Sequence, residues 1–328
     1  MKCINKWICL SLLIAVSCVS GCGKTSAVIE QPYDVYATAA DFGLSSNGSA
    51  EAKSYFASDL CVSEDVAIGT DSTDSQVAEG AGTFNLEPNT VVYAKNLYER
   101  LYPASTTKIL TAYIALKYCD DLDAMVTVSE NAVNQASDSS VCNLKAGDVI
   151  RLRDLLYGLM LRSGNDAAVA IAEYISGDVD SFAALMNQEA VAMGATRSHF
   201  VNPNGLPDEN HYTCVYDMYL IFSNAVKNDT FVSIIGTTSY DVTYTDASGE
   251  AVTHTWENTN QYLTGNATTP DGFQIVGGKT GTTGEAGYCL VLYSYNPSGQ
   301  PIISIVFKAD GKSNLYLLMN EMLQGFAI

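Results

Sequence analysis

Apolar residues follow a strand-like pattern towards both ends of the main body of the chain. Short apolar runs at residues 79–86 and 91–95 flank Glu87-Pro88-Asn89, a combination typical of a β-hairpin. Three further runs at 273–283, 288–295 and 301–309 are joined by the glycine-containing turns 284–287 and 297–300. These patterns predict two strands before the middle of the chain and three strands after it.

Between these strands, apolar residues recur every three or four positions, which is the period of an amphipathic helix. The pattern predicts helices over 105–117, 153–162, 166–176, 180–193 and 213–227, and a closing helix over 312–324. Strands at both ends with helices between them indicate an α+β fold. We expect an antiparallel β-sheet assembled from the two ends of the chain, flanked by helices and accompanied by a mostly helical subdomain.

The composition and net charge of the chain argue against one class of function. Of the 328 residues, 47% are hydrophobic, enough for a large core, and 36 acidic residues outnumber 17 basic ones to give a net charge of -19. Proteins that bind nucleic acid use a basic surface to displace counterions. The charge therefore argues against a nucleic-acid partner.

The first 22 residues resemble an export signal. Lys2 and Lys6 precede an apolar stretch at 7–19, which is shorter than the ~20 residues needed to span a bilayer. The stretch ends in Val19-Ser20-Gly21-Cys22, which resembles a bacterial lipobox. The sequence therefore predicts a lipoprotein signal peptide at 1–21 and a lipid anchor on Cys22, the alternative being an ordinary secretory signal with an incidental cysteine.

Residues 22–58 are rich in Ser, Ala, Asp and Thr and have few cations, as expected of a flexible tether. Such a tether would place a globular catalytic domain, residues 59–328, outside the cytoplasm on a membrane, facing the cell wall. The body contains Cys61, Cys119, Cys142, Cys214 and Cys289 without any Cys-x-x-Cys pair. We expect these to be mainly buried free thiols, with one disulfide as the open alternative.

The first candidate for chemistry is Ser105-x-x-Lys108, the only Ser-x-x-Lys in the chain. Residues three apart share a helix face, so the lysine nitrogen can reach the serine hydroxyl. A hydroxyl at a helix N-terminus also lies beside unpaired backbone N–H groups, which can stabilise negative charge on a bound carbonyl. The alternative is a serine that caps the helix, followed by a surface lysine.

The second candidate is Lys279-Thr280-Gly281, on a predicted strand between Gly277-Gly278 and Thr282-Thr283. A lysine and a hydroxyl on a sheet edge can bind a carboxylate at the end of an extended peptide, and glycine leaves room for its backbone. The alternative is an exposed lysine beside a β-bulge.

The third candidate is Ser163-Gly164-Asn165, in a break between two predicted helices. Ser-x-Asn occurs elsewhere, but Ser129-Glu-Asn fits the N-cap of a short helix better. His211 and Cys214 are a pair at helical spacing that suits packing better than metal binding.

The three motifs, in this order, are the signature set of penicillin-recognising serine enzymes. The chain resembles the D-alanyl-D-alanine carboxypeptidase family of low-molecular-mass penicillin-binding proteins over about residues 60–325. Longer blocks carry the resemblance, at 102–112, 162–168, 199–206, 211–213 with Asp217, and 277–283 with 286–290. Two departures are Cys214-Val215, where Thr-Ala is usual, and Asn204, where His is common.

The resemblance implies a penicillin-binding, β-lactamase-like transpeptidase fold and a serine-type D-Ala-D-Ala carboxypeptidase that needs no metal or organic cofactor. Its partners would be peptidoglycan stem peptides ending in D-Ala-D-Ala, with β-lactam antibiotics as covalent inhibitors. Ser105 would be the nucleophile and Lys108 its base. Burial beside a second cation such as Lys279 would lower the pKa of Lys108 as the mechanism requires.

The remaining roles also follow from the resemblance. Ser163 would pass a proton to the departing D-Ala, while Asn165 would hold Lys108 and the substrate amide. The binding residues would be Lys279 and Thr280 for the terminal carboxylate, Gly281 beside the substrate backbone, and the backbone N–H groups of Ser105 and Thr282 for the oxyanion.

Three other functions share some of these motifs. A DD-transpeptidase would use an amine in place of water. A class A β-lactamase needs a Glu-x-x-x-Asn after the second motif, whereas Glu130 to Asn134 is the only such string and precedes Ser163. A non-catalytic, penicillin-sensing or wall-binding lipoprotein would not require Lys108 and Ser163 in addition to Lys279.

Overall fold

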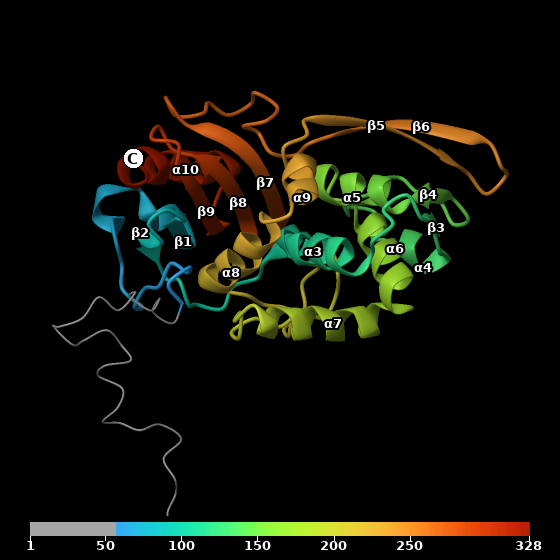
Figure 1. Cartoon of the computed structure of the whole chain (residues 1–328), viewed down its shortest axis with the longest axis horizontal. Coiled ribbons are helices and arrows are strands. Elements are labelled where there is room, and N and C mark those ends of the chain that lie inside the picture. Colours follow the sequence, from blue (N-terminus) through green and yellow to red (C-terminus); the bar gives the residue numbers. More distant parts are fainter. Residues whose placement is uncertain (1–56) are drawn as a thin grey trace, which may run out of the picture. The chain divides into compact units, whose positions relative to one another are not determined.

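The computed structural model describes residues 57–328, so the leader, Cys22 and nearly all of the expected tether lie outside the described residues. Its main feature is a five-stranded antiparallel sheet with the strand order β2-β1-β9-β8-β7 (Figure 1). The strands are β1 (Ala78–Asn85), β2 (Thr90–Lys95), β7 (Gln274–Thr283), β8 (Gly287–Tyr295) and β9 (Pro301–Ala309). The predicted sheet from both ends of the chain is confirmed.

Both faces of this sheet are covered. Along β8, Leu290 and Leu292 pack with the closing helix α10 (Lys312–Phe326), whereas Val291 and Tyr293 belong to the core on the helical side. Side chains alternate between the faces of a strand, so a strand that is buried on both faces is apolar throughout. This explains why the sequence of β8 is a continuous apolar run.

The helical region surrounds α3 (Lys108–Tyr118), which contacts several other helices and is buried along most of its length (Figure 1). The other helices of this region are α4 (Glu130–Val133), α5 (Leu152–Leu161), α6 (Asn165–Ser176), α7 (Val179–Ala192), α8 (Val215–Ala225) and α9 (Asp229–Ile235). Short 3₁₀ turns occur at Thr70–Ser72, Ser75–Val77 and Ala104–Thr107.

The start of α3 corrects one prediction. The sequence pattern indicated a single helix from residue 105, but Ser105 lies in the 3₁₀ turn Ala104–Thr107 and the α-helix begins at Lys108. A 3₁₀ turn keeps residues three apart on one face, so the apolar pattern cannot distinguish the two. The turn leaves Ser105 at the end of the helix, where it borders the sheet.

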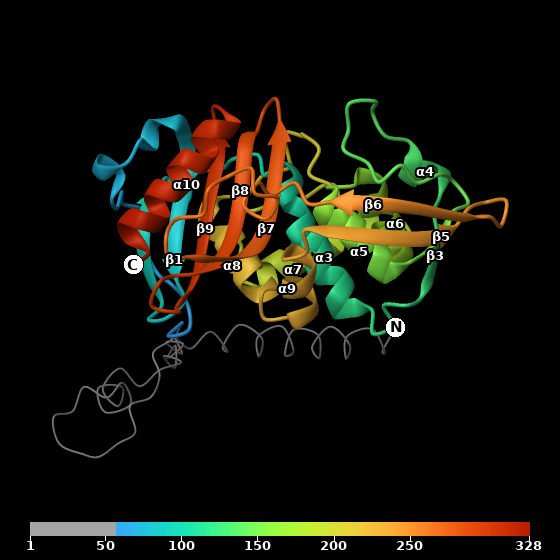
Figure 2. The same ribbon diagram turned by 90° about the horizontal axis from the view of Figure 1, so that it is seen from above.

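A second, four-stranded sheet was missing from the sequence analysis. Its order is β3-β4-β5-β6, with β3 (Met125–Thr127), β4 (Val149–Arg151), β5 (Ser239–Thr245) and β6 (Ala251–Glu257). The β5–β6 hairpin runs along the helical region (Figure 2). Tyr240 of β5 stacks on Tyr157 of α5 at 3.8 Å between ring centroids and donates a hydrogen bond to Asp154. These contacts fix the hairpin on α5.

Two smaller predictions are confirmed. Ser129 caps α4, because its Oγ accepts a hydrogen bond from the Ala132 N–H at 2.9 Å. The five cysteines of the described region are free, four of them buried and Cys119 half-buried. Within residues 57–328, no helix is sufficiently long and apolar to cross a bilayer.

Candidate active site

Ser105 and Lys108 are joined by a hydrogen bond at the start of α3. Lys108 Nζ lies 2.9 Å from Ser105 Oγ, 2.8 Å from Asn165 Oδ1 and 2.7 Å from the backbone oxygen of Asn204. The amide and carbonyl oxygens can only accept, so Nζ donates to both. A neutral amine then has one lone pair left, which the Ser105 hydroxyl can donate to. The surroundings of Lys108 therefore suit a neutral amine next to a serine.

Electrostatics favour the same protonation state. Lys108 is fully buried, and burial holds the pKa of its ammonium well below the ordinary lysine range. The nearby charge of Lys279 lowers the pKa of Lys108 further, while Cys142 and Asp166 act weakly in the opposite direction. A lysine in this position can take a proton from a serine near neutral pH.

Ser163 and Asn165 lie in the break between α5 and α6. Ser163 has a φ of 58°, an uncommon conformation for a non-glycine residue. It directs the buried Ser163 hydroxyl towards Lys279, whose Nζ donates to Ser163 Oγ at 3.0 Å. Asn165 is the first residue of α6, and its amide oxygen accepts the hydrogen bond from Lys108. The two side chains thus contact the two lysines.

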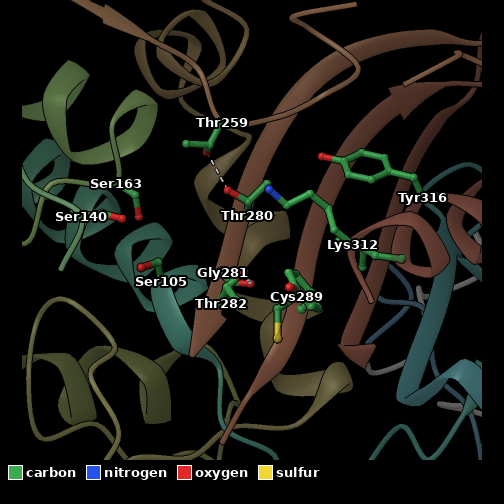
Figure 3. Close-up of a pocket in the computed structure, with 12 residues that line it drawn as sticks. Ser105, Ser140, Ser163, Thr259, Thr280, Gly281, Thr282, Cys289, Lys312 and Tyr316 are labelled. Carbon is green, nitrogen blue, oxygen red and sulfur yellow. Dashed lines mark hydrogen bonds between the residues drawn. The ribbon is translucent and has the colours of Figure 1, made fainter. Parts of the chain in front are cut away.

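Lys279 and Thr280 project to opposite sides of the edge strand β7. Lys279 is 1% exposed and points towards Ser163, and burial lowers the pKa of its ammonium to about 7. Thr280 Oγ1 lies 2.6 Å from Thr259 Oγ1 (Figure 3). Because both Lys108 and Lys279 are buried, the alternatives of a surface lysine and an exposed edge lysine are wrong.

The backbone around Ser105 is tightly packed. A Cβ on Gly281 would lie 3.0 Å from the Ser105 nitrogen, so β7 passes directly beside the serine. Gly205 has a φ of 85°, and a Cβ there would lie 1.8 Å from the Ala104 oxygen. Ala104 itself has a φ of 48°. These close approaches hold the Ser105 turn between β7 and the 204–205 loop.

The comparisons with known proteins agree with this geometry. The family model for D-alanyl-D-alanine carboxypeptidases, peptidase group S11, matches residues 70–311. This chain belongs to that family.

Several relatives support the assignment. A D-alanyl-D-alanine carboxypeptidase from Streptomyces sp. (strain K15) is 34% identical over 265 residues, which cover 76% of this chain and 88% of the relative. DacF, a D-alanyl-D-alanine carboxypeptidase from Bacillus subtilis, is 33% identical over 75% of this chain. The match covers only 61% of the length of DacF.

Solved structures of the family share the fold. The Streptomyces K15 DD-transpeptidase matches with a TM-score of 0.71 and 32% identity, covering 77% of this chain and 98% of that one. DacD, a D-alanyl-D-alanine carboxypeptidase from Francisella tularensis, matches with a TM-score of 0.66 and 28% identity, covering 75% and 69%. The α+β, penicillin-binding fold expected from the resemblance is therefore confirmed.

In this family member, Ser105 lies where two hollows of the cleft meet. The first, the Lys312 hollow, has a volume of about 210 Å³ and lies beside Ser163, Thr280, Lys312 and Tyr316 (Figure 3). Lys312 extends into it from the start of α10. The sequence analysis did not single out Lys312 as a site residue, because one lysine at the start of a helix has no distinguishing pattern.

The second, the Asp138 hollow, has a volume of about 370 Å³. Asp138, Asn165 and Glu285 line it, and it shares Ser105 and Thr282 with the Lys312 hollow. Sequence reasoning also missed Asp138 and Glu285, which lie outside every motif. The backbone contact of Asn204 with Lys108 has no sequence signal either, since any residue type supplies a carbonyl oxygen.

His211 packs beside the Ser105 turn. Its Nε2 lies 2.9 Å from Thr107 Oγ1, and its Nδ1 accepts a hydrogen bond from the Val201 N–H at 3.2 Å. Burial lowers the pKa of His211 to about 4, so the ring is neutral near pH 7. The Cys214 sulfur caps α8 by accepting from the Asp217 N–H at 3.4 Å. His211 and Cys214 therefore make local hydrogen bonds within the fold.

Proposed function

We propose that this chain is a serine-type D-Ala-D-Ala carboxypeptidase that removes the terminal D-Ala from peptidoglycan stem peptides. The observation that carries the proposal is the buried Lys108, with one lone pair available to the Ser105 hydroxyl and two acceptors for its own N–H groups. A merely structural serine and lysine would not need a fully buried amine beside a second lysine.

In the acylation step, Ser105 Oγ attacks the carbonyl carbon of the penultimate D-Ala while Lys108 Nζ takes the hydroxyl proton. Negative charge develops on the carbonyl oxygen, and the backbone N–H groups of Ser105 and Thr282 stabilise it. Both residues line the two hollows, and β7 passes beside Ser105. The pocket geometry supports this assignment of the oxyanion site.

Departure of the terminal D-Ala requires a proton on its nitrogen. Ser163 can relay it, because its hydroxyl lines the Lys312 hollow and is hydrogen-bonded to Lys279. The hydroxyl gives its proton to the nitrogen and takes in return the proton that Lys108 removed from Ser105, which leaves Lys108 neutral again. Asn165 holds Lys108 through its amide oxygen and leaves its amide N–H₂ for the substrate. Water then attacks the acyl-enzyme while Lys108 takes its proton, and Lys108 returns this proton to Ser105 Oγ as the shortened peptide leaves.

The terminal carboxylate binds beside Thr280 and Lys279. The Thr280 hydroxyl and Lys312 share the Lys312 hollow, and Lys279 lies directly behind Ser163. Gly281 leaves no side chain between β7 and Ser105, so an extended peptide can approach the strand. A hydroxyl and two lysines at one end of the cleft suit a C-terminal carboxylate.

An amine acceptor in place of water would make the same acyl-enzyme a transpeptidase. The specific observation in favour of this second function is the similarity to the Streptomyces K15 DD-transpeptidase over 98% of that chain. The two functions share every step up to the acyl-enzyme.

We also propose that the catalytic domain works outside the cytoplasm, held at a membrane by a lipid on Cys22 and lifted by the 22–58 tether. The support is the sequence Val19-Ser20-Gly21-Cys22 after an apolar stretch that is too short to span a bilayer. Residues 59–328 would then reach the cell wall.

Covalent labelling tests the central assignment. A fluorescent penicillin should increase the intact mass of the protein by one penicillin, located on Ser105, and a peptide ending in D-Ala-D-Ala should release free D-Ala. Ser105→Ala should abolish both. An unchanged mass, or labelling of Ser105→Ala, would refute the nucleophile, and product analysis with an added amine separates hydrolysis from transpeptidation.

A further inference from the structure

Asp166 is a buried acidic residue directly behind the Ser163–Asn165 motif, and the proposed mechanism gives it no role. It is the second residue of α6 and is 2% exposed. A Cβ on Gly164 would lie 2.9 Å from Asp166 Oδ1, so the carboxylate lies against the backbone of the motif. Within residues 57–328, none of the ion pairs includes Asp166. A buried charge without an ion-pair partner has to be stabilised by hydrogen bonds.

Three backbone N–H groups donate those hydrogen bonds to the Asp166 carboxylate. The Cys142 nitrogen lies 2.9 Å from Oδ1 and 3.0 Å from Oδ2, and the Leu144 nitrogen lies 3.1 Å from Oδ2. The Ala167 nitrogen, in the first turn of α6 itself, lies 2.9 Å from Oδ1. An ionised carboxylate can only accept hydrogen bonds, and each of these three partners can only donate one. The surroundings of Asp166 therefore suit a carboxylate and no neutral amide.

A further hydrogen bond joins the 140–144 segment to α6 in the opposite direction. The Ser140 carbonyl oxygen accepts from the Asn165 N–H at 2.8 Å. Asn143 lies between the two donors of the segment and has a φ of 65°. A left-handed residue in this position allows the N–H groups on either side of it to converge on one anion. Because Ser140 lines both hollows, the contacts that hold this segment also hold a wall of the cleft (Figure 3).

The position of Asn165 depends on these contacts. The Asn165 backbone N–H is bound by Ser140, and its side-chain oxygen accepts from Lys108 Nζ at 2.8 Å. If the first turn of α6 moved away from the 140–144 segment, that oxygen would move away from Lys108. An N–H group of a fully buried amine would then lose its acceptor, which is costly.

We propose that Asp166 is a positioning residue for the acylation of Ser105: its carboxylate ties the 140–144 segment to the start of α6 and so holds Asn165 against Lys108. The proposal rests on the proposed function, in which Lys108 takes the proton of Ser105. Asp166 itself touches neither the substrate nor the reacting atoms and acts through Asn165.

The charge of Asp166 has a second effect, on Lys108 in the course of the reaction. Lys108 becomes positive when it takes the proton, and a nearby negative charge favours that state. Burial and the charge of Lys279 on β7 lower the pKa of Lys108, whereas Cys142 and Asp166 raise it. His211, which packs beside the same turn, is neutral near pH 7 because burial lowers its pKa to about 4. Loss of the Asp166 charge should therefore lower the pKa of Lys108 further.

Asp166→Asn tests both effects. In either orientation, asparagine turns an N–H₂ group towards backbone donors, and it removes the charge. We expect the rate constant for acylation of Ser105 by penicillin to fall by about 10- to 100-fold, as for a misplaced catalytic group. The rising limb of the pH profile should move to lower pH, a change that loss of a purely structural contact would not cause.

Asp180→Asn is the matched control for this variant. Asp180 is the second residue of α7, as Asp166 is of α6, but it is exposed. Its replacement should leave the rate and the pH profile unchanged. A wild-type rate in Asp166→Asn, an unmoved rising limb, or an equal loss in Asp180→Asn would overturn the proposal.

Asn143 provides a second test that keeps Asp166 and its charge. The Asn143 side chain is exposed, so a substitution there acts through the backbone. Valine strongly disfavours a positive φ and glycine adopts it freely. Asn143→Val should therefore slow acylation by about 3- to 10-fold without moving the rising limb, and Asn143→Gly should retain the wild-type rate.

The Asn143 pair keeps the proposal testable even if Asp166→Asn fails to fold, which thermal unfolding would show. Equal rates of acylation in Asn143→Val and Asn143→Gly would overturn the role of the 140–144 segment while leaving the proposed function intact. A wild-type protein that neither binds penicillin nor releases D-Ala would instead refute the function itself.

Discussion

Lys279 Nζ and Ser163 Oγ lie 3.0 Å apart although 116 residues separate them in the chain. This hydrogen bond joins the edge strand of the main sheet to the break between two helices. It also brings a second lysine close to Lys108, where its charge contributes to the lowered pKa of that residue. The two lysines therefore share one environment, although we assign them different roles.

Lys108→Arg tests proton transfer. Arginine keeps the positive charge but cannot be neutral near pH 7, so it cannot accept the proton of Ser105. We expect the rate of acylation by both penicillin and peptide to fall by about 10³-fold, within the range for loss of a general base. Lys117→Arg, the same change on the same helix, should have no such effect. Comparable losses in both variants would point to damage to α3 instead.

The pH profile tests Lys279. Activity of the free enzyme should rise with pH as Lys108 loses its proton, and should fall again as Lys279, with a pKa lowered to about 7, becomes neutral and binds the carboxylate less well. Lys279→Arg should retain measurable acylation at a lower maximum. Because arginine stays charged, its kcat/KM profile should keep the rising limb and lose the falling limb. A falling limb unchanged in Lys279→Arg would assign it to another group.

The carboxylate contact can be tested without mutation. A peptide ending in D-Ala-D-Ala-amide lacks the charge that Thr280 and Lys279 are assigned to bind. We expect its kcat/KM to be lower by about 10- to 100-fold, or about 1.4 to 2.7 kcal/mol. Equal hydrolysis of the amide and the free acid would remove both residues from this role.

Gly177 and Gly205 have nearly the same backbone conformation, so alanine substitutions at the two positions distinguish the cost of backbone strain from that of a steric clash. Gly177 has a φ of 86°, and a Cβ added there would have no atom within 4 Å, whereas a Cβ on Gly205 would lie 1.8 Å from the Ala104 oxygen. Gly177→Ala should cost about 1 kcal/mol of unfolding free energy. Gly205→Ala should cost a further ~1 to 3 kcal/mol and reduce acylation, because it displaces the Ser105 turn. Thermal unfolding and penicillin labelling of both variants provide the measurement.

Cys22→Ala tests the anchor. Without the thiol there is no site for the lipid, so the protein should leave the membrane fraction for the medium, or accumulate as an unprocessed precursor. Cell fractionation with immunoblotting measures this. Normal processing and unchanged membrane association would exclude a lipid on Cys22.

Sequence reasoning located the elements whose apolar pattern is strong. β9 agrees at both ends and β8 to within one residue, because strands buried on both faces form continuous apolar runs. β7 also agrees to within one residue, although it is an edge strand rich in Gly and Thr. β5 and β6 were missed because each has one exposed face and few apolar residues. β5 is made up mainly of Thr, Tyr, Ser and Asp, and β6 includes Thr, His and Glu. β3 and β4, of three residues each, are too short for any periodic pattern.

For the candidate site, the motifs identified the side chains at its centre but not the backbone and charged groups that surround them. Ser105, Lys108, Ser163, Asn165 and Lys279 were selected by spacing, and hydrogen bonds link them in the fold. The Asn204 carbonyl and the charges of the cleft could not be predicted, because they depend on how distant loops pack. Local spacing contains no information about those contacts.

The pairing of β1 with β9 has a consequence for how the molecule is made. A ribosome releases residues 78–85 long before residues 301–309, so β1 must wait for its inner neighbour until β9 has been synthesised. Contacts this distant in sequence slow folding, because a long loop must close first. β7 forms its ladder with β8, which is equally late. A growing chain can therefore hold Ser105 and Lys108 in a helical segment while the strand beside them does not yet exist, so the surroundings of Ser105 are completed only after β7 and its neighbours β8 and β9 have been synthesised.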